Sequence, residues 1–229
     1  MGISMTQTFS WWESQGELPV ADMLGRRAAR RATFLARSAA YAIESVGGFE
    51  DGTSVVFGSC LGNIGVTMEL LEQFYSGDSK LSPIRFMNSV HHAPVSHVSI
   101  AADKTGFVTA VAAAQDLCAV ALMESIGVCL QRRDDVVLVL CEERWPGAFT
   151  TQDFEPYAGA VRLEWVADED QTIQLDRVDT TYSDAGLPEA IQGNPAAQLE
   201  HIIAWFDEGG DDGRLIAPSG DGSWRLSRT

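Results

Sequence analysis

The feature of the sequence that most constrains the fold is a stretch at residues 116–130 that is apolar on nearly every side. If the stretch forms an α-helix, polar side chains interrupt it mainly at Glu124 and Ser125. A helix that is hydrophobic all round is buried, either in a protein core or in a membrane. A membrane span needs about 18 or more consecutive apolar residues, and no stretch of the sequence is that long. We therefore expect residues 116–130 to form a buried helix at the centre of a globular fold.

Shorter apolar runs and helical patterns alternate along the rest of the chain. Periodicity and glycine turns predict strands at residues 54–57, 107–111 and 136–141, and amphipathic helices at residues 26–46, 64–75 and 196–206. The strand at 136–141 is apolar throughout, which is typical of a strand inside a parallel sheet. Such alternation of strands and helices builds α/β folds.

Three other segments carry separate predictions. Residues 160–166 and 172–178 are strand candidates on either side of an acidic loop, and we expect them to pair antiparallel. Residues 76–103 contain Pro83 and Pro94 and are predicted to be a loop region.

Length and charge limit the architecture and the partners. With 229 residues, 45% of them hydrophobic, the chain can form one domain with a sizeable core. We expect this domain to cover residues 1–229, with its core at residues 26–178 and a C-terminal helix and tail at residues 194–229. The net charge of −16 would repel nucleic acid and anionic membrane surfaces, so we expect neither as a partner.

The cysteines and the N-terminal residues predict a cytoplasmic protein. Four cysteines lie in apolar segments and show neither the spacing of a disulfide framework nor that of a zinc site. The first residues contain no basic segment followed by an apolar run, so we expect no export signal. The glycines around Cys60 do not have the spacing of a dinucleotide-binding loop. We therefore expect neither a metal nor a cofactor.

Cys60 is the first candidate nucleophile. It lies within residues 58–62 (GSCLG), a pattern typical of a tight turn from a strand into a helix. If Cys60 reacts, His91 or His97 from the following segment could act as its base. The alternative is that the glycines only permit a tight turn and that Cys60 fills a small space. Short glycine patterns often arise by chance, which favours the packing role.

The first turn of the predicted central helix is the second place where a thiol could react. The positive end of a helix dipole lowers the pKa of a nearby thiol. The sequence there contains Gln115, Asp116 and Cys118. The amide of Gln115 cannot attack a thioester, and the negative charge of Asp116 opposes a thiolate. We therefore expect Cys118 to pack in the core, with a role as nucleophile as the alternative.

A cluster of arginines is the strongest positive feature of this acidic chain. It consists of Arg26, Arg27, Arg30 and Arg31, with Arg37 following in the same segment. The cluster could bind an acidic protein or a phosphate group. The alternative is that it is simply the solvated face of a helix.

Several short segments, taken in order, resemble the N-terminal domain of the β-ketoacyl synthases, and in particular its chain-length-factor-like branch. They are residues 55–59 (VVFGS), 81–83 (LSP), 88–91 (NSVH), 97–101 (HVSIA) and 105–106 (TG). The resemblance covers residues 26–166. It implies a thiolase-like half fold, in which a mixed, mostly parallel sheet of five strands lies between helices and one central helix is buried.

The resemblance also implies a role for Gln115. In this family a short strand after a Thr-Gly step leads to the nucleophilic cysteine at the start of the buried helix. Counting from Gly106, this position falls at Gln115 or within one residue of it. A glutamine there resembles the chain length factors, the partners of catalytic ketosynthases in which glutamine replaces the cysteine. Both catalytic histidines of a full ketosynthase lie in a second half that this sequence does not contain, so we transfer neither role to His91 or His92.

The function that the resemblance implies is that of an accessory protein in type II fatty-acid or polyketide biosynthesis, for example of aryl polyenes, without condensing activity of its own. Its expected partners are a catalytic ketosynthase or a second copy of itself, and an acyl carrier protein. In family dimers the strand before the nucleophile pairs across the two-fold axis, which assigns the interface to Phe107, Val108, Thr109, Ala110 and Val111. A lone half would leave one helical layer uncovered, which predicts an exposed apolar surface.

Two other functions stay open, because a fold does not by itself define a function. One is a thiol acyltransferase or thioesterase that uses Cys118 or Cys60 with a histidine as base. The other is a non-catalytic protein that binds an acyl chain, or binds an acyl carrier protein through the arginine cluster.

Overall fold

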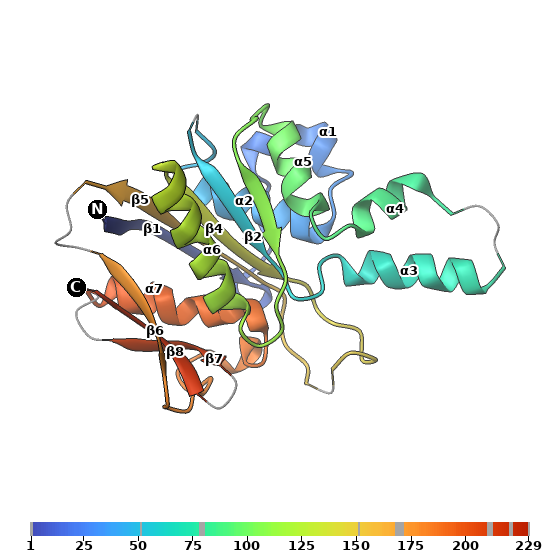
Figure 1. Ribbon diagram of the computed structural model, residues 1–229. Coiled ribbons are helices and arrows are strands. Elements are labelled where there is room, and N and C mark those ends of the chain that lie inside the picture. Colours follow the sequence, from blue (N-terminus) through green and yellow to red (C-terminus); the bar gives the residue numbers. More distant parts are fainter. Residues whose placement is uncertain are drawn as a thin grey trace.

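A mixed five-stranded sheet forms the centre of the protein (Figure 1). The computed structural model describes residues 2–50, 52–77, 81–150, 152–167, 172–209, 213–219 and 222–228, with the side chains of Arg26 and Ser219 left aside. The strand order is β1 (Gly2–Trp12), β5 (Tyr157–Val166), β4 (Val136–Glu142), β2 (Ser54–Gly58) and β3 (Val108–Val111). β2 pairs parallel with both β3 and β4, whereas β5 pairs antiparallel with β4 and β1. The predicted five-stranded sheet in an α/β fold is thus confirmed.

Alternating residues of the sheet face two separate helical layers. On one face Val55, Phe57 and Val139 pack with residues of α2 (Phe34–Ser45) and α5 (Ala93–Ala101). On the other face Val56 and Leu138 pack with α6 (Leu117–Arg132), the predicted central helix. α6 buries eight residues, and Arg133, the residue that follows it, has the left-handed conformation often found after a helix. The expectation of a buried central helix is confirmed.

The prediction of one long helix at residues 26–46 is wrong. The segment forms α1 (Gly25–Ala29), which follows the short helix η2 (Asp22–Leu24), and then α2. The Thr33 side chain accepts a hydrogen bond from the Ala36 backbone N–H at 3.2 Å and so begins α2 as an N-cap. Apolar periodicity continues across the break, and this is why the sequence pattern did not show it.

The pairing predicted for residues 160–166 and 172–178 is also wrong. β5 belongs to the central sheet, whereas β6 (Ile173–Val178) pairs with β8 (Gly222–Arg228), and β7 (Arg214–Ser219) completes a second, three-stranded sheet. The acidic loop expected at residues 168–170 lies outside the described residues.

The C-terminal segment, residues 172–228, covers the α6 side of the protein. It contains the second sheet, η3 (Glu189–Ile191), η4 (Pro195–Gln198) and α7 (Leu199–Asp207). Leu199, Ile202, Ile216 and Leu226 are fully buried in the same core cluster as α6. The C-terminal segment therefore covers part of the helical layer that we expected to be uncovered, while Met123 and Leu130 of α6 remain exposed, at 39% and 44%.

Residues 76–103 are not a loop region as predicted, because they contain the helices α4 (Pro83–Ser89) and α5. Each proline stands in the first turn of a helix. A backbone N–H there has no acceptor within the helix, so proline, which lacks the N–H, costs no hydrogen bond. α3 (Ile64–Tyr75) and α4 lie against each other and project from the body of the protein (Figure 1). We call α3 and α4 the arm.

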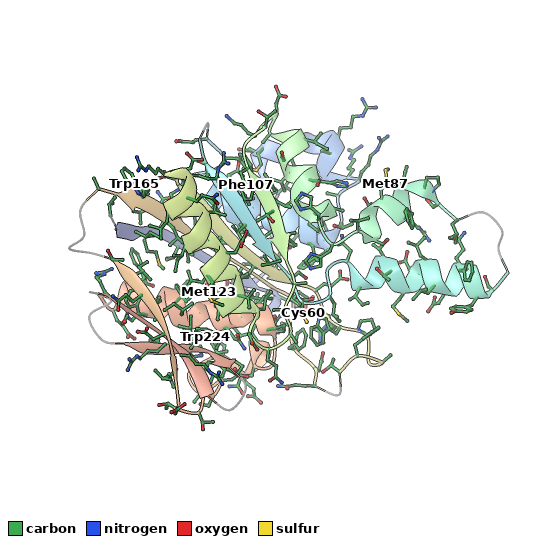
Figure 2. All side chains as sticks on the ribbon, viewed as in Figure 1. Cys60, Met87, Phe107, Met123, Trp165 and Trp224 are labelled. Carbon is green, nitrogen blue, oxygen red and sulfur yellow. The ribbon has the colours of Figure 1, made fainter. Side chains whose placement is uncertain are left out.

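The exposed apolar surface of the protein lies mainly on the arm. Its most exposed large apolar side chains are Phe74, Tyr75, Ile84, Phe86 and Met87, each at least 59% exposed. Met87 points away from the body in Figure 2. Among the described residues, no helix is both long enough and apolar enough to span a membrane.

Candidate functional site at the start of the buried helix

Gln115 lies two residues before α6, at the mouth of a polar hollow. β3 ends at Val111, and a short irregular segment carries the chain to the helix. The hollow has a volume of about 550 Å³, and we call it the polar hollow. Its lining includes Gln115, Trp145, Tyr182, Asp184, Asn194 and Gln198. The C-terminal segment thus provides most of the wall that faces Gln115.

Cys118 does not open to this hollow. Its side chain is fully buried in the core between the central sheet and the C-terminal segment. Burial raises the pKa of the Cys118 thiol well above its ordinary value, because a thiolate loses its hydration there. Asp116 is the N-cap residue of α6, but its side chain makes no capping hydrogen bond. This geometry agrees with a packing role for Cys118.

Cys60 is half-buried in the turn at residues 58–62, which we call the glycine turn. The turn connects β2 to α3, as the sequence pattern predicted. Figure 2 shows Cys60 at the base of the arm. Burial, and then the neighbouring Glu142 carboxylate, raise the pKa of the Cys60 thiol to about 11. The thiol is therefore protonated at neutral pH, which does not favour a nucleophilic role.

Glu142 is a buried carboxylate that the sequence analysis did not single out. It lies at the end of β4, next to the glycine turn, and its side chain is fully buried. Its Oε2 accepts hydrogen bonds from Ser59 Oγ at 3.0 Å and from the Cys60 N–H at 2.5 Å. Its Oε1 accepts from the Leu61 N–H at 3.3 Å and from Trp145 Nε1 at 2.8 Å. Glu142 thus joins the glycine turn to one wall of the polar hollow.

The sequence contained a signal for this carboxylate. Two acidic residues follow directly after an apolar strand that was predicted to lie in a parallel sheet. In open α/β sheets, the carboxyl ends of parallel strands are where binding sites form. The second residue, Glu143, accepts a hydrogen bond from the Gly65 N–H at 2.7 Å, and burial raises its pKa. The two carboxylates therefore hold the glycine turn and the first turn of α3 at the end of β4.

Glu142 should make the protein less stable as the pH rises through the neutral range. Burial raises its pKa from 4.5 to about 7, although the four donated hydrogen bonds oppose this rise. The folded protein therefore keeps a proton that the unfolded chain releases, so the stabilisation is complete below pH 4.5 and is lost as the pH rises to about 7. The difference corresponds to about 3 kcal/mol. Urea unfolding across this range should show a smaller loss in Glu142→Gln than in the natural protein, and equal losses would contradict the prediction.

The two histidines considered as bases lie in different places. His91 contacts the glycine turn, where its Nε2 donates a hydrogen bond to the Ser59 carbonyl at 2.8 Å. His97 is on α5 and lines a second hollow beside α1. His91 therefore lies beside the glycine turn that contains Cys60, but its Nε2 already donates to a backbone carbonyl, whereas His97 lies at a different hollow.

The second hollow, which we call the arginine hollow, has a volume of about 630 Å³ and brings together part of the arginine cluster. Arg27, Arg31 and His97 line it, together with apolar residues such as Leu24 and Ile100. Arg30 is exposed outside the lining, and the side chain of Arg26 lies outside the described residues. The described lining contains basic and apolar side chains but no acidic one.

β3 is an edge strand of the central sheet. It pairs only with β2, so the other side of its backbone is free within the described chain. The strand covers Val108, Thr109, Ala110 and Val111, while Phe107 lies just before it. An unpaired strand edge is a template for pairing with another chain.

The fold and the site together define a class of protein: an α/β half fold in which a short edge strand leads into a buried helix that begins beside a glutamine. The family described as "Beta-ketoacyl synthase, N-terminal domain" matches residues 4–224. The chain therefore belongs to this family, as the sequence resemblance implied. No curated protein shows significant sequence similarity to the chain.

Solved structures with the same fold agree with this assignment. The structure of a ketosynthase (ApeO) in complex with its chain length factor (ApeC) from Xenorhabdus doucetiae has a TM-score of 0.74 and 19% identity, and the match covers 100% of both chains. The ishigamide ketosynthase/chain length factor has a TM-score of 0.56 and 16% identity over 69% of this chain and 53% of that chain. A β-ketoacyl synthase from Burkholderia phymatum STM815 has a TM-score of 0.55 and 15% identity over 72% and 52%. The chain thus spans about half the length of the latter two.

Proposed function

We propose that the protein is a chain-length-factor-like accessory subunit of type II fatty-acid or polyketide biosynthesis, with no condensing activity of its own. The observation that carries this proposal is the amide of Gln115 at the start of α6, where the family resemblance places a reactive thiol. Cys118, the thiol closest to it in the sequence, is fully buried. Condensation needs a nucleophile that can hold an acyl group, and a carboxamide cannot do this. We include in the proposal that the pathway makes polyenes, such as aryl polyenes.

The partner in this proposal is a catalytic ketosynthase, with a second copy of the chain as the alternative. β3 has a free edge, and the arm projects beyond this edge with its exposed apolar side chains (Figure 1). A free strand edge beside an apolar surface is suited to a large protein interface. The similar structure from Xenorhabdus doucetiae is a complex of a ketosynthase with its chain length factor, which supports a mixed complex.

Co-expression with a full-length ketosynthase tests the proposal. We expect a mixed complex with one copy of each chain by mass measurement, and condensation of malonyl thioesters by the complex only. The chain alone should neither load an acyl group nor condense. The proposal would be wrong if the purified chain by itself loaded and condensed malonyl thioesters.

The rival function, a cysteine-dependent acyltransferase or thioesterase, makes an opposite prediction. Exposure of the chain to an activated acyl thioester should leave its mass unchanged, because the Cys118 thiol is buried and the pKa of Cys60 is raised to about 11. Intact-protein mass spectrometry at neutral pH checks this. An adduct that disappears in Cys60→Ala or Cys118→Ala would support the rival. Acylation of the unfolded chain is the positive control.

We also propose that the arginine hollow contacts an acidic partner, namely an acyl carrier protein. Its lining is basic and apolar although the chain as a whole has a net charge of −16, so it can attract an acidic partner. Arg27→Glu with Arg31→Glu should weaken carrier binding at least tenfold, because two attractive charges become repulsive. Isothermal titration at two salt concentrations measures the effect. The matched reversal of Arg225 and Arg228 on β8 should leave carrier affinity unchanged, and equal losses in both pairs would contradict the proposal.

A further inference from the structure

The arginine hollow combines exposed basic side chains with an apolar lining. It forms where η2 and α1 contact α5, and Figure 1 shows α1 and α5 side by side. Arg27 and Arg31 are exposed, whereas Leu24 is only 5% exposed. Ile100 of α5 lines the other side and is 78% exposed. The volume of about 630 Å³ is within the range of pockets that hold small molecules.

The two arginines of this hollow lie on the same side of one helical turn. Arg27 belongs to α1, and the turn continues beyond the helix, because the backbone N–H groups of Arg31 and Ala32 both donate to the Ala28 carbonyl at 3.0 Å. Residues four positions apart on such a turn are neighbours. Neither arginine takes part in an ion pair within the described part of the chain. Both guanidinium groups are therefore available to one anion.

The rest of the lining limits the chemistry of the anion. A planar guanidinium group matches the two oxygens of a carboxylate. A nucleotide or a sugar phosphate would bring many further polar atoms, and the described lining contains no hydroxyl or amide side chain to pair with them. The lining is otherwise mostly apolar, with Leu24 and Ile100 as its largest apolar residues. These groups suit a ligand that has one carboxylate and an apolar chain.

We propose that the arginine hollow binds a small amphiphilic carboxylate, with the carboxylate between Arg27 and Arg31 and the apolar chain against Leu24 and Ile100. The same hollow is the proposed contact of the carrier protein, so a bound carboxylate would compete with the carrier. A free acid would then lower carrier binding as its concentration rises. This competition rests on the proposed function, whereas binding of the carboxylate does not.

Titration of the full chain into octanoate that carries carbon-13 in its carboxylate tests the proposal by NMR. Three comparison compounds separate the contributions of charge and chain. Acetate has the carboxylate without the chain, octanol has the chain without the charge, and octyltrimethylammonium has the chain with the opposite charge. We expect saturable binding of octanoate only, because the arginines select the negative charge and the apolar lining selects the chain.

Paired variants locate the site on the protein. Arg27→Gln with Arg31→Gln should weaken octanoate binding about tenfold or more, whereas Arg225→Gln with Arg228→Gln on β8 should not change it. Ile100→Asn should weaken binding about fivefold through lost apolar contact. Its matched control is Ile84→Asn on the arm, which is 63% exposed and should leave the affinity unchanged. All these positions lie at the surface, so the variants should melt at the temperature of the natural chain.

Three results would overturn the proposal: no saturable binding of octanoate, equal affinity for octanol or for octyltrimethylammonium, or octanoate binding that the variant of Arg27 and Arg31 leaves unchanged. A second titration, of carrier protein into the chain at saturating octanoate, should show weaker carrier binding than without octanoate. If octanoate binds in the hollow and the carrier does not bind at all, the carrier proposal fails while the carboxylate site stands.

Discussion

Replacing Glu142 with leucine should lower the free energy of unfolding by about 3 kcal/mol at a pH where the carboxylate is ionised. The substitution removes the acceptor of four hydrogen bonds, which come from Ser59, Cys60, Leu61 and Trp145. Each buried donor that loses its acceptor costs about 1–3 kcal/mol. The sum is reduced because water can reach the half-buried donors and because leucine removes the burial cost of the ionised carboxylate. Urea unfolding followed by circular dichroism measures the change.

The conservative variant and a matched control make this prediction specific. Glu142→Gln keeps the shape but turns an amide N–H₂ toward donors, so it should cost less than leucine but still destabilise. Glu17→Leu, at an exposed position, should change the free energy of unfolding by no more than about 0.5 kcal/mol. If Glu142→Leu were as stable as the natural protein, Glu142 would not hold the glycine turn in the way that the structure indicates.

Replacing Ile84 and Phe86 with serine should abolish binding of the partner ketosynthase. Both side chains are 63% exposed on the arm, and neither supports the fold of the isolated chain. If the partner covers them, each is expected to contribute about 2 kcal/mol, so the pair should weaken the complex about a thousandfold. Analytical ultracentrifugation of the co-purified chains, or titration of one into the other, measures this loss.

Two comparisons separate an interface effect from damage to the fold. The double variant should unfold at the same urea concentration as the natural chain, because exposed apolar side chains contribute little to the stability of the isolated protein. Val20→Ser changes an apolar side chain that is equally exposed, at 63%, but lies before η2 and away from the arm. It should leave the complex intact. A complex of normal affinity with the arm variant would show that the partner binds elsewhere.

Much of the site could be located from local sequence patterns. The all-round apolar stretch predicted α6, and the short apolar runs predicted β2, β3 and β4. β2 and β4 are buried at every position, whereas β3 is half-buried at the edge of the sheet. The placement of Gln115 before the helix depended on the family resemblance together with this local pattern. Burial of the Cys118 side chain agreed with the expected packing role.

Elements whose pattern was weaker, or whose partner lies far away in sequence, were missed. β1 was not predicted, yet it pairs with β5 along nearly its whole length, from Gly2 opposite Val166 to Trp12 opposite Tyr157. Strand propensity depends strongly on context, and this strand is formed by a neighbour more than a hundred residues away. The role of Glu142 was missed for the same reason, since its partners Ser59 and Cys60 are more than eighty residues distant.

The sequence by itself determined which segments have to be buried and which residue stands before the central helix, because periodicity and residue chemistry are local properties. Only the tertiary structure decided where the C-terminal segment packs. It covers part of the α6 layer that a lone half fold was expected to expose, and it supplies Gln198 and Asp184 to the hollow at Gln115. The physical reason is that pairing of strands and closure of a hollow depend on contacts between distant parts of the chain, which no local pattern encodes.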